Sequence, residues 1–341
     1  MKKVLLRSTL LFSFVSLAFS LSVLRAQDAS GLELLEVRKI WDYADYNSFT
    51  DLVWFRGYFY CSFREGHAHA GGDQGKVRIL RSRDGREWLP VAFFSIPVKE
   101  GTVVFDLRDP KLGIAHGDSL VCNMGVTLWI GGKPVGMAPR VASSRDGLHW
   151  SAPEPVSIHD RWPWHPVWHG KYQWVVSYRG DTNVVWLERS EDGFVFTPVA
   201  TLRTPRNRPN EVTLRFDRND RMVGLFRTAG GDRSAFLGLS EAPYTRWRYH
   251  DLGRYVGGPD LLVLAPGRYL CAGRMMIGGE PKTCVARLDE QGHISSPLVL
   301  PSGGDNSYPG MVLHNGFLWV SYYSSHEGKA SIYLARIRLR K

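Results

Sequence analysis

Tyr308 and Glu211 are residues that could act together as a nucleophile and its base. A tyrosine hydroxyl is a weak nucleophile because its pKa is about 10, so a neighbouring carboxylate has to take its proton. An aryl oxygen suits a carbon that itself bears a carboxylate, because a carboxylate nucleophile would be repelled there. The alternative is structural, with Tyr308 in the core before a Pro-Gly turn and Glu211 paired with an arginine.

Arginines recur at the end of the second strand of several predicted hairpins. One such strand, 222–227, follows a strand that opens with Glu211, with a polar turn at 217–220 between them. In a tight hairpin the start of one strand lies beside the end of the next, so Glu211 and Arg227 should share one edge of the sheet. Strand 318–323 ends in tyrosine at the same position. The other arginines at this position are Arg64, Arg179 and Arg274.

Guanidinium groups that converge on one point repel each other unless an anion or carboxylates compensate them. Because the guanidinium fork matches a carboxylate geometrically, these arginines could bind the carboxylate of an acidic sugar. The structural alternative is that each arginine pairs with a neighbouring Asp or Glu. Arg108, in the strand that begins F-D-L-R-D, could join them, because alternation places it on the same face as Asp106. An Asp106–Arg108 pair would again be structural.

The loop R-E-G-H-A-H-A-G-G-D, which follows the first hairpin, contains the candidates for proton transfer, His67 and Asp73. His67 and His69 could also bind a metal, but H-x-H without further ligands is a weak signal. A solvated loop is the bland alternative. We predict no metal site and no cofactor.

The elements that position these residues are repeated. Three turns share the pattern S-x-D-x-G followed by an aromatic residue, at 82–88, 144–150 and 190–196. The Asp accepts bonds from following amides and the Gly adopts the positive φ that the turn needs. Around these turns we identify six units of about four short strands each, which indicates a propeller. The units begin near Asn47, Thr102, Trp162, Asn210, Gly257 and Asn306.

The last unit has only three clear strands, and the segment Leu32 to Trp41 is left over at the front of the chain. We expect this segment to supply the missing outer strand and close the ring, which removes exposed sheet edges. No amphipathic helix and no Gly/Ser-rich linker is present in the sequence. The fold predicted is all-β, a six-bladed β-propeller in one domain over residues 27–341.

These motifs resemble the sialidase superfamily. The S-x-D-x-G-x-x-W turns are similar to its Asp boxes, which occur in propellers of many functions. More specific is the order of four residues: a glutamate opening a central strand, an arginine ending the next, an arginine one blade later, and a tyrosine opening the last blade. Glu211, Arg227, Arg274 and Tyr308 follow this order. The resemblance covers essentially the whole chain after the first 26 residues.

The sequence departs from the family pattern in blade one. The family has its first arginine there, whereas this chain has S-F-T-D-L-V at 48–53, without an arginine. Asp51 of this stretch is counted with Arg64, Arg108 and Arg179 among the further substrate-binding candidates. The family's acid/base aspartate belongs to the following loop, where Asp73 is its possible counterpart.

The N-terminal residues match a secretory signal peptide over 1–26, with a basic start, an apolar run and small residues before a cleavage point. We therefore expect a secreted or periplasmic protein without a membrane span. Without Lys2, Lys3, Arg7 and Arg25 the chain has 39 basic and 33 acidic residues, a net charge of +6. This moderate excess suits an anionic small substrate, and no nucleic-acid motif is present.

The four cysteines, Cys61, Cys122, Cys271 and Cys284, have no metal-type spacing. Cys271 and Cys284 lie on successive predicted strands and could pair in an oxidising compartment. We expect a monomer.

The resemblance implies a glycoside hydrolase of the exo-alpha-sialidase type that acts on a terminal acidic sugar of a glycan. In that hypothesis Tyr308 is the nucleophile, Glu211 is its base, and Asp73 or His67 is the acid/base. Two alternatives stay open. A uronate-specific polysaccharide lyase would use the same arginines, with His67 or Tyr308 moving the proton. A non-catalytic carbohydrate-binding propeller would bind a glycan without turning it over.

Overall fold

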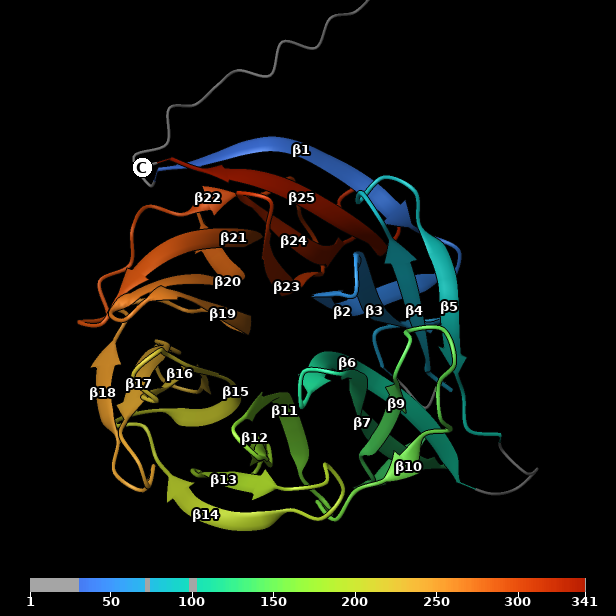
Figure 1. The fold of residues 1–341 in the computed structure, drawn as a ribbon, viewed down its shortest axis with the longest axis horizontal. Coiled ribbons are helices and arrows are strands. Elements are labelled where there is room, and N and C mark those ends of the chain that lie inside the picture. Colours follow the sequence, from blue (N-terminus) through green and yellow to red (C-terminus); the bar gives the residue numbers. More distant parts are fainter. Residues whose placement is uncertain (1–30, 71–73, 98–102, 341) are drawn as a thin grey trace, which may run out of the picture.

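The structure, a computed structural model, describes residues 31–70, 74–97 and 103–340. Six antiparallel sheets are arranged in a ring around a central axis, and every regular element in the described residues is a strand (Figure 1). This confirms the predicted six-bladed β-propeller. The predicted signal peptide, residues 1–26, lies outside the described residues. The first described residue is Gly31.

The blades begin close to the predicted positions. From the axis outward, blade one is β2 (Tyr46–Phe55), β3 (Tyr58–Gly66), β4 (Lys76–Ser82) and β5 (Leu89–Phe94). Blade two is β6 (Val104–Ala115), β7 (Ser119–Ile130), β9 (Arg140–Ser144) and β10 (Glu154–Pro155), with β8 (Lys133–Met137) paired to β7. Blade three is β11 (Trp162–His169), β12 (Tyr172–Tyr178), β13 (Val185–Ser190) and β14 (Thr197–Leu202).

The remaining three blades follow the same order from the axis outward. Blade four is β15 (Arg208–Phe216), β16 (Met222–Ala229), β17 (Phe236–Ser240) and β18 (Arg248–Asp251). Blade five is β19 (Gly257–Ala265), β20 (Arg268–Ile277), β21 (Glu280–Asp289) and β22 (Leu298–Val299). Blade six is β23 (Asn306–His314), β24 (Phe317–Ser324), β25 (Ser331–Leu339) and β1 (Leu32–Trp41).

The ring is closed by the first strand of the chain, as predicted. β1 pairs antiparallel with β25, from Leu32 opposite Leu339 to Trp41 opposite Ile332, and so completes blade six (Figure 1). The hydrophobic core lies between adjacent blades. For example, Leu225 and Leu237 of blade four pack with Leu261 and Cys271 of blade five in one buried cluster.

The three S-x-D-x-G turns have the expected hydrogen bonds. In the third, Asp192 Oδ1 accepts from the amides of Phe194 and Val195 at 2.8 and 2.9 Å, and Gly193 has a φ of 81°. The Ser190 hydroxyl accepts from the Gly193 amide at 2.9 Å. Each turn joins the two outer strands of a blade.

The cysteines are buried free thiols in the described residues. Cys271 lies opposite Ala286, and Cys284 lies opposite Gly273, so the two thiols are offset along the ladder and do not pair. Burial raises the pKa of both thiols to about 12.

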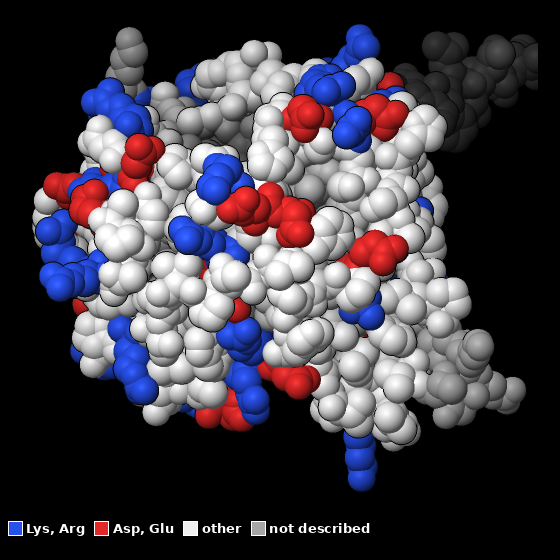
Figure 2. Space-filling view, turned by 60° about the horizontal axis from the view of Figure 1, so that its bottom comes forward, with Lys and Arg blue, Asp and Glu red and all other residues white. Residues whose placement is uncertain are grey.

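On the face seen in Figure 2, Lys and Arg are interspersed with Asp and Glu. Within the described ranges we find no helix of the length and hydropathy that crossing a membrane would require.

Candidate active site

A β-bulge interrupts the innermost strand of every blade at the same position. In each bulge two residues of the inner strand lie opposite one residue of the second strand, which redirects the side chains there. In β23, for example, Tyr308 and Pro309 lie between the pairs Ser307–Tyr323 and Gly310–Ser321. The residues in the six bulges are 49–50, 109–110, 165–166, 210–211, 258–259 and 308–309.

Four of these bulges place a non-glycine residue in the left-handed region of backbone conformation. The φ angles are 60° for Phe49, 43° for Asp109, 39° for His165 and 50° for Tyr308. This conformation is costly for residues with a side chain, and such strain gathers at functional sites. The fifth, at Gly258, needs glycine because an added Cβ would lie 2.7 Å from the Tyr308 ring.

Tyr308, Glu211 and Arg227 form a hydrogen-bonded triad at the centre of this ring. The Tyr308 hydroxyl donates to Glu211 Oε1 at 2.9 Å, and Arg227 Nη1 donates to the same carboxylate oxygen at 2.5 Å and to the Tyr308 hydroxyl at 3.2 Å. The Gly258 amide donates to Glu211 Oε2 at 3.0 Å. The adjacency of Glu211 and Arg227 that the hairpin predicted is confirmed, and Tyr308 joins them from another blade.

The environment of Tyr308 keeps its hydroxyl neutral in the free protein. Burial, and then the negative charge of Glu211, raise the pKa of Tyr308 well above its usual value, while Arg227 acts in the opposite direction. Phe49 and Trp164 pack edge-on against its ring, with centroids 5.0 and 5.4 Å away. Nucleophilic attack by this oxygen therefore requires Glu211 to accept its proton, and the 2.9 Å hydrogen bond already provides the path.

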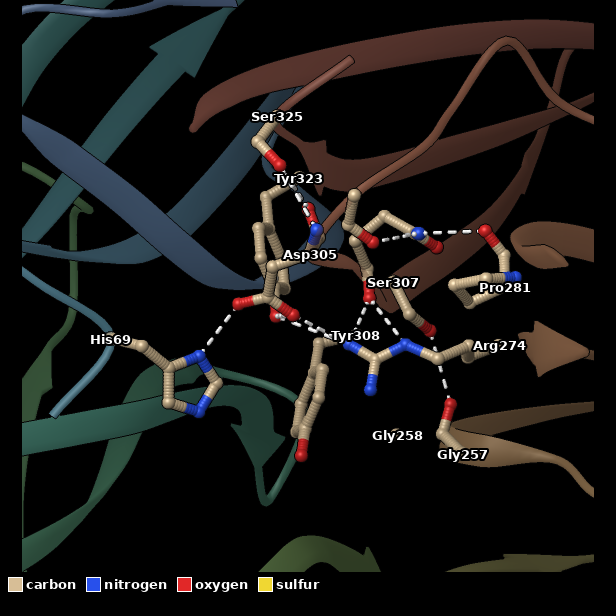
Figure 3. Close-up of polar contacts among 12 residues, drawn as sticks. His69, Gly257, Gly258, Arg274, Pro281, Asp305, Ser307, Tyr308, Tyr323 and Ser325 are labelled. Carbon is tan, nitrogen blue, oxygen red and sulfur yellow. Dashed lines mark hydrogen bonds and ion pairs between the residues drawn. The ribbon is translucent and has the colours of Figure 1, made fainter. Parts of the chain in front are cut away.

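Arg274 lies beside Tyr308, across from His69, and is held by Asp305 and by residues of blade six (Figure 3). Its Nε donates to the Asn306 carbonyl at 2.9 Å, and its Nη2 donates to Asp305 Oδ1 at 2.9 Å. Nη2 also contacts the Asn306 carbonyl and the Tyr323 hydroxyl. Within the described residues Nη1 has no hydrogen bond, and the side chain is 19% exposed. Arg274 can therefore still donate to a ligand.

Arg108 stands out because its guanidinium makes no hydrogen bond to any described residue. Its Nε is buried and unpartnered, its Nη1 lies 3.8 Å from Asp106 Oδ2, and its plane covers the Phe49 ring at 5.0 Å. A buried N–H without a partner costs free energy unless a ligand completes it. Arg227 has the same feature, since its Nε is also buried and unpartnered. Both arginines therefore have an N–H group that could donate to an anion.

Asp109 is a candidate that the sequence reasoning missed. It is 9% exposed, its Oδ1 is buried without a hydrogen-bond partner in the described residues, and it lies in the bulge of β6. Burial raises the pKa of Asp109, with Arg108 opposing the shift and Glu211 adding to it. The signal was present in the sequence, because Asp109-Pro110 occupies the same position of its blade as Tyr308-Pro309.

Arg64 and Arg179 are engaged away from the triad. Arg64 is fully buried, with Nε donating to Asp106 Oδ1 at 2.8 Å and Nη1 donating to the Ala68 carbonyl at 2.8 Å. Arg179 is 46% exposed and donates twice to Asp181, at 3.0 and 2.8 Å. The structural alternative thus describes both residues, because each is compensated by an aspartate and neither takes part in the triad's hydrogen bonds.

The blade-one loop places its two histidines differently. His67 is 83% exposed, with Nδ1 2.7 Å from Asp45 Oδ2. His69 faces blade six, with Nδ1 2.6 Å from Asp305 Oδ2, and its ring packs edge-on against Phe49 at 5.0 Å. Asp73 lies outside the described residues. Of the histidines in this loop, His69 is therefore the one beside the residues that pack on Tyr308.

Asp51, the remaining substrate-binding candidate, is buried in a cluster of charges contributed by five inner strands. It is 1% exposed, its Oδ2 accepts from the Leu112 amide at 2.7 Å, and it lies 3.5 Å from His165 Nε2. This burial removes Asp51 from contact with a substrate. We call this group the buried charge cluster: Asp51, Lys111, His165, Arg215 and Asp260.

Buried polar hydrogen bonds hold this cluster together. Arg215 Nη2 donates to Asp260 Oδ1 at 2.7 Å and lies 3.2 Å from His165 Nε2. Lys111 Nζ donates to the Thr50 carbonyl at 2.9 Å. Asp260 Oδ2 accepts from the Met311 amide at 2.9 Å, three residues after Tyr308. Among the described residues, no three His, Cys, Asp or Glu side chains are grouped so that they could hold a metal ion.

Comparison with known proteins supports the fold. No family model matches the chain, and no curated protein matches its sequence. A protein of unknown function from Dyadobacter fermentans superposes with a TM-score of 0.78 at 18% identity, covering 91% of this chain and 100% of that one. Trypanosoma rangeli sialidase in complex with sialic acid gives 0.67 at 12% identity, covering 92% and 59%.

A third similar structure is an alpha-L-arabinofuranosidase variant from Fusarium graminearum in complex with an iminosugar inhibitor. It superposes with a TM-score of 0.64 at 12% identity, covering 90% of this chain and 98% of that one. The chain has the sialidase-like propeller fold. This chain spans about three fifths of the sialidase's length, and identities this low establish the architecture only.

Proposed function

We propose that the protein is a glycoside hydrolase that removes a terminal acidic sugar from a glycan and retains the configuration at the anomeric carbon. The observation that supports this best is the Tyr308 hydroxyl donating to Glu211 at 2.9 Å beside Arg227. Glu211 accepts the proton while the Tyr308 oxygen bonds to the anomeric carbon, which gives a covalent glycosyl-enzyme that water then hydrolyses. Arg227 stabilises the charge on both partners.

The sugar's carboxylate would be bound by Arg108, Arg227 and Arg274, which we call the arginine clamp. Each has N–H groups without a hydrogen bond in the described residues, and their side chains are 14%, 21% and 19% exposed. Charge-assisted bonds from such groups to a carboxylate are the strong class of hydrogen bond. The stretch 48–53 of blade one contains no arginine. In this proposal Arg108, which packs on the Phe49 ring of that stretch, binds the carboxylate in place of the missing arginine.

A hydrolase that acts on a neutral sugar is the second candidate. One observation favours it: Arg227 and Arg274 are each already paired with a carboxylate, Glu211 and Asp305. A neutral sugar needs no clamp, and buried Asp109 and Glu211 would then serve as the two carboxylates that ordinary glycosidases use. The similarity to an arabinofuranosidase is compatible with this candidate.

The test is release of the aglycone from an aryl alpha-sialoside and from an aryl alpha-L-arabinofuranoside, by the wild type and by Tyr308→Phe. We expect the sialoside to be cleaved and kcat to fall about 10³-fold or more in the variant, because the nucleophilic oxygen is lost. Tyr43→Phe, at an exposed tyrosine, is the matched control and should leave kcat unchanged. A fluorinated sialic acid should leave a covalent adduct on the peptide that contains Tyr308.

The other outcomes discriminate between the candidates. Cleavage of the arabinofuranoside alone, with Tyr308→Phe active, would favour the neutral-sugar hydrolase. Ultraviolet-absorbing products from uronic-acid oligosaccharides would indicate a lyase. If calorimetry detects binding of sialic acid but no substrate is turned over, the protein is a non-catalytic carbohydrate-binding propeller.

A further inference from the structure

His69 is paired with a carboxylate that four side chains hold in place. Its Nδ1 lies 2.6 Å from Asp305 Oδ2, while Asp305 Oδ1 accepts from Arg274 and Tyr323, each at 2.9 Å (Figure 3). The Tyr46 hydroxyl also donates to Asp305 Oδ2. Burial acts to raise the pKa of Asp305, but the hydrogen bonds from His69 and Tyr46 lower it to about 2. Asp305 is therefore an anion with a fixed position.

This pairing determines which ring nitrogen of His69 can act on a ligand. Because a carboxylate only accepts hydrogen bonds, Nδ1 must bear the proton between His69 and Asp305, and Nε2 remains available. A carboxylate that orients a histidine in this way is a recurring arrangement in catalytic sites. Figure 3 shows the second nitrogen of His69 pointing away from Asp305, on the side where the Tyr308 hydroxyl lies.

His69 is separated from the proposed nucleophile by one aromatic ring. Its imidazole packs edge-on against Phe49 with centroids 5.0 Å apart, and Phe49 packs edge-on against Tyr308, also at 5.0 Å. His69 also belongs to the charges that act on Asp109. A sugar bound over Phe49 and Tyr308 would therefore have His69 at its border.

Exposure distinguishes His69 from the other groups around Tyr308 that could transfer a proton. The aglycone of an exo-acting glycosidase leaves toward solvent, so the group that protonates it must lie on the open side of the site. The His69 side chain is 48% exposed, whereas Glu211 and Asp109 are 4% and 9% exposed. The buried carboxylates suit the sugar side, and His69 suits the leaving-group side.

We propose that His69, oriented by Asp305, is the acid/base of this site, an assignment that rests on the proposed hydrolase function. In the first step imidazolium Nε2–H gives its proton to the glycosidic oxygen as the C–O bond to the aglycone breaks. The Tyr308 oxygen bonds to the anomeric carbon, and Glu211 takes the tyrosine proton. In the second step neutral Nε2 takes a proton from water, whose oxygen displaces Tyr308, and Glu211 returns the proton to the tyrosine.

The experiment compares His69→Gln with His67→Gln on aryl alpha-sialosides whose phenols differ in acidity. His67→Gln is the matched control, because it removes a histidine of the same loop whose carboxylate partner, Asp45, is 72% exposed. For His69→Gln we expect kcat/KM on a phenyl sialoside to fall about 10²- to 10³-fold, the usual contribution of a general acid. On a dinitrophenyl sialoside, whose leaving group needs no proton, we expect a loss below about tenfold.

Chemical rescue provides a second readout that a merely structural role would not move. In His69→Ala, added imidazole should restore part of the phenyl sialoside rate, and it should have no effect on His67→Ala. An equal fall in kcat/KM on all sialosides, without rescue by imidazole, would mean that His69 only holds the loop in place, and it would overturn the assignment. An unchanged kcat/KM would overturn it too. A wild type that cleaves none of these sialosides would overturn the proposed acidic-sugar hydrolase together with this assignment.

Discussion

Two groups of buried charge lie along the axis of the propeller, and they differ in how completely they are hydrogen-bonded. In the buried charge cluster, both oxygens of the Asp260 carboxylate accept hydrogen bonds, from Arg215, Leu261 and Met311. Among the side chains of this cluster, the neutral ring nitrogen His165 Nδ1 is the one buried atom without a hydrogen-bond partner in the described residues, and no charged group lacks one. In the group around Tyr308, Arg108 and Asp109 retain buried polar atoms without partners in the described residues. Both groups include residues of the inner strands β6 and β15.

The difference teaches that burial and charge alone do not identify a site in this fold. A buried polar group with its hydrogen bonds completed contributes to the fold, whereas one left incomplete costs stability until a ligand completes it. Asp260 illustrates the first case, because both of its carboxylate oxygens accept hydrogen bonds. Arg108 illustrates the second.

The largest effect on stability is expected from the cluster. Asp260→Ala removes the acceptor of Arg215 and of the Leu261 and Met311 amides, and it leaves a partly buried charge without its partner. We expect the free energy of unfolding to fall by about 3–5 kcal/mol. Urea denaturation followed by tryptophan fluorescence measures it. A variant that is as stable as the wild type but inactive would show that Asp260 acts in the candidate active site. The distinction between the buried charge cluster and the group around Tyr308 would then be wrong.

A smaller effect, on binding alone, is expected from Arg108→Gln. Because the buried Arg108 Nε has no partner in the described residues and costs stability, its removal should leave the free energy of unfolding unchanged or raise it by about 1 kcal/mol. Loss of its charge-assisted bonds to the sugar, about 1.5–3 kcal/mol, should raise KM about ten- to hundredfold with kcat little changed. Steady-state kinetics beside Arg179→Gln, the control at a solvent-exposed arginine, would test this. An equal rise in KM for both would refute the clamp.

A third effect is on the pH dependence of stability, where Asp51 of the cluster and Asp305 beside His69 have opposite signs. Burial raises the pKa of Asp51 to about 7, with Lys111 opposing, so the folded state holds a proton that the unfolded chain releases near pH 4. The contribution of Asp51 to the free energy of unfolding therefore falls as pH rises from about 4 to about 7. For Asp305, whose pKa is about 2, the stability contribution is present above about pH 4 and is lost as pH falls toward 2.

Unfolding free energies of the wild type, Asp51→Asn and Asp305→Asn between pH 2 and pH 8 measure these contributions. Asp51→Asn mimics the protonated acid, so its stability should decline less than that of the wild type between pH 4 and pH 7. Asp305→Asn should lack part of the loss in acid. Identical pH profiles for all three proteins would mean that neither carboxylate titrates differently in the folded state.

The sequence was sufficient for the architecture because the signals that specify it are local. The Ser-Asp-Gly turns at 82–88, 144–150 and 190–196 mark where one strand of a blade ends and the next begins. The segment Leu32 to Trp41 belongs to no unit of its own, and the last unit lacks an outer strand, so the segment is assigned to that position. The adjacency of Glu211 and Arg227 followed from hairpin geometry in the same way. Each of these inferences needs only residues close in the chain, or a count of strands.

The parts that could not be predicted depend on contacts between blades and on departures from alternation. Arg64 was a clamp candidate, but its partner Asp106 comes from the next blade, 42 residues away. Asp109 was missed because a bulge inserts one residue and so breaks the period of two on which strand faces are assigned. From the sequence His67 and not His69 was a candidate for proton transfer, because a loop has no period and the Asp305 that orients His69 lies just before β23, far away in the chain.

The seam at which the ring closes has a mechanical consequence. β1 and β25 are antiparallel, and the ends of this pair nearest the chain termini, Leu32 and Leu339, face each other. A force that pulls the two termini apart is therefore applied across one pair of residues at a time, so the strands unzip and do not slide. Blade six would lose its outer strand at low force, and five blades with complete sheets would remain to resist further extension.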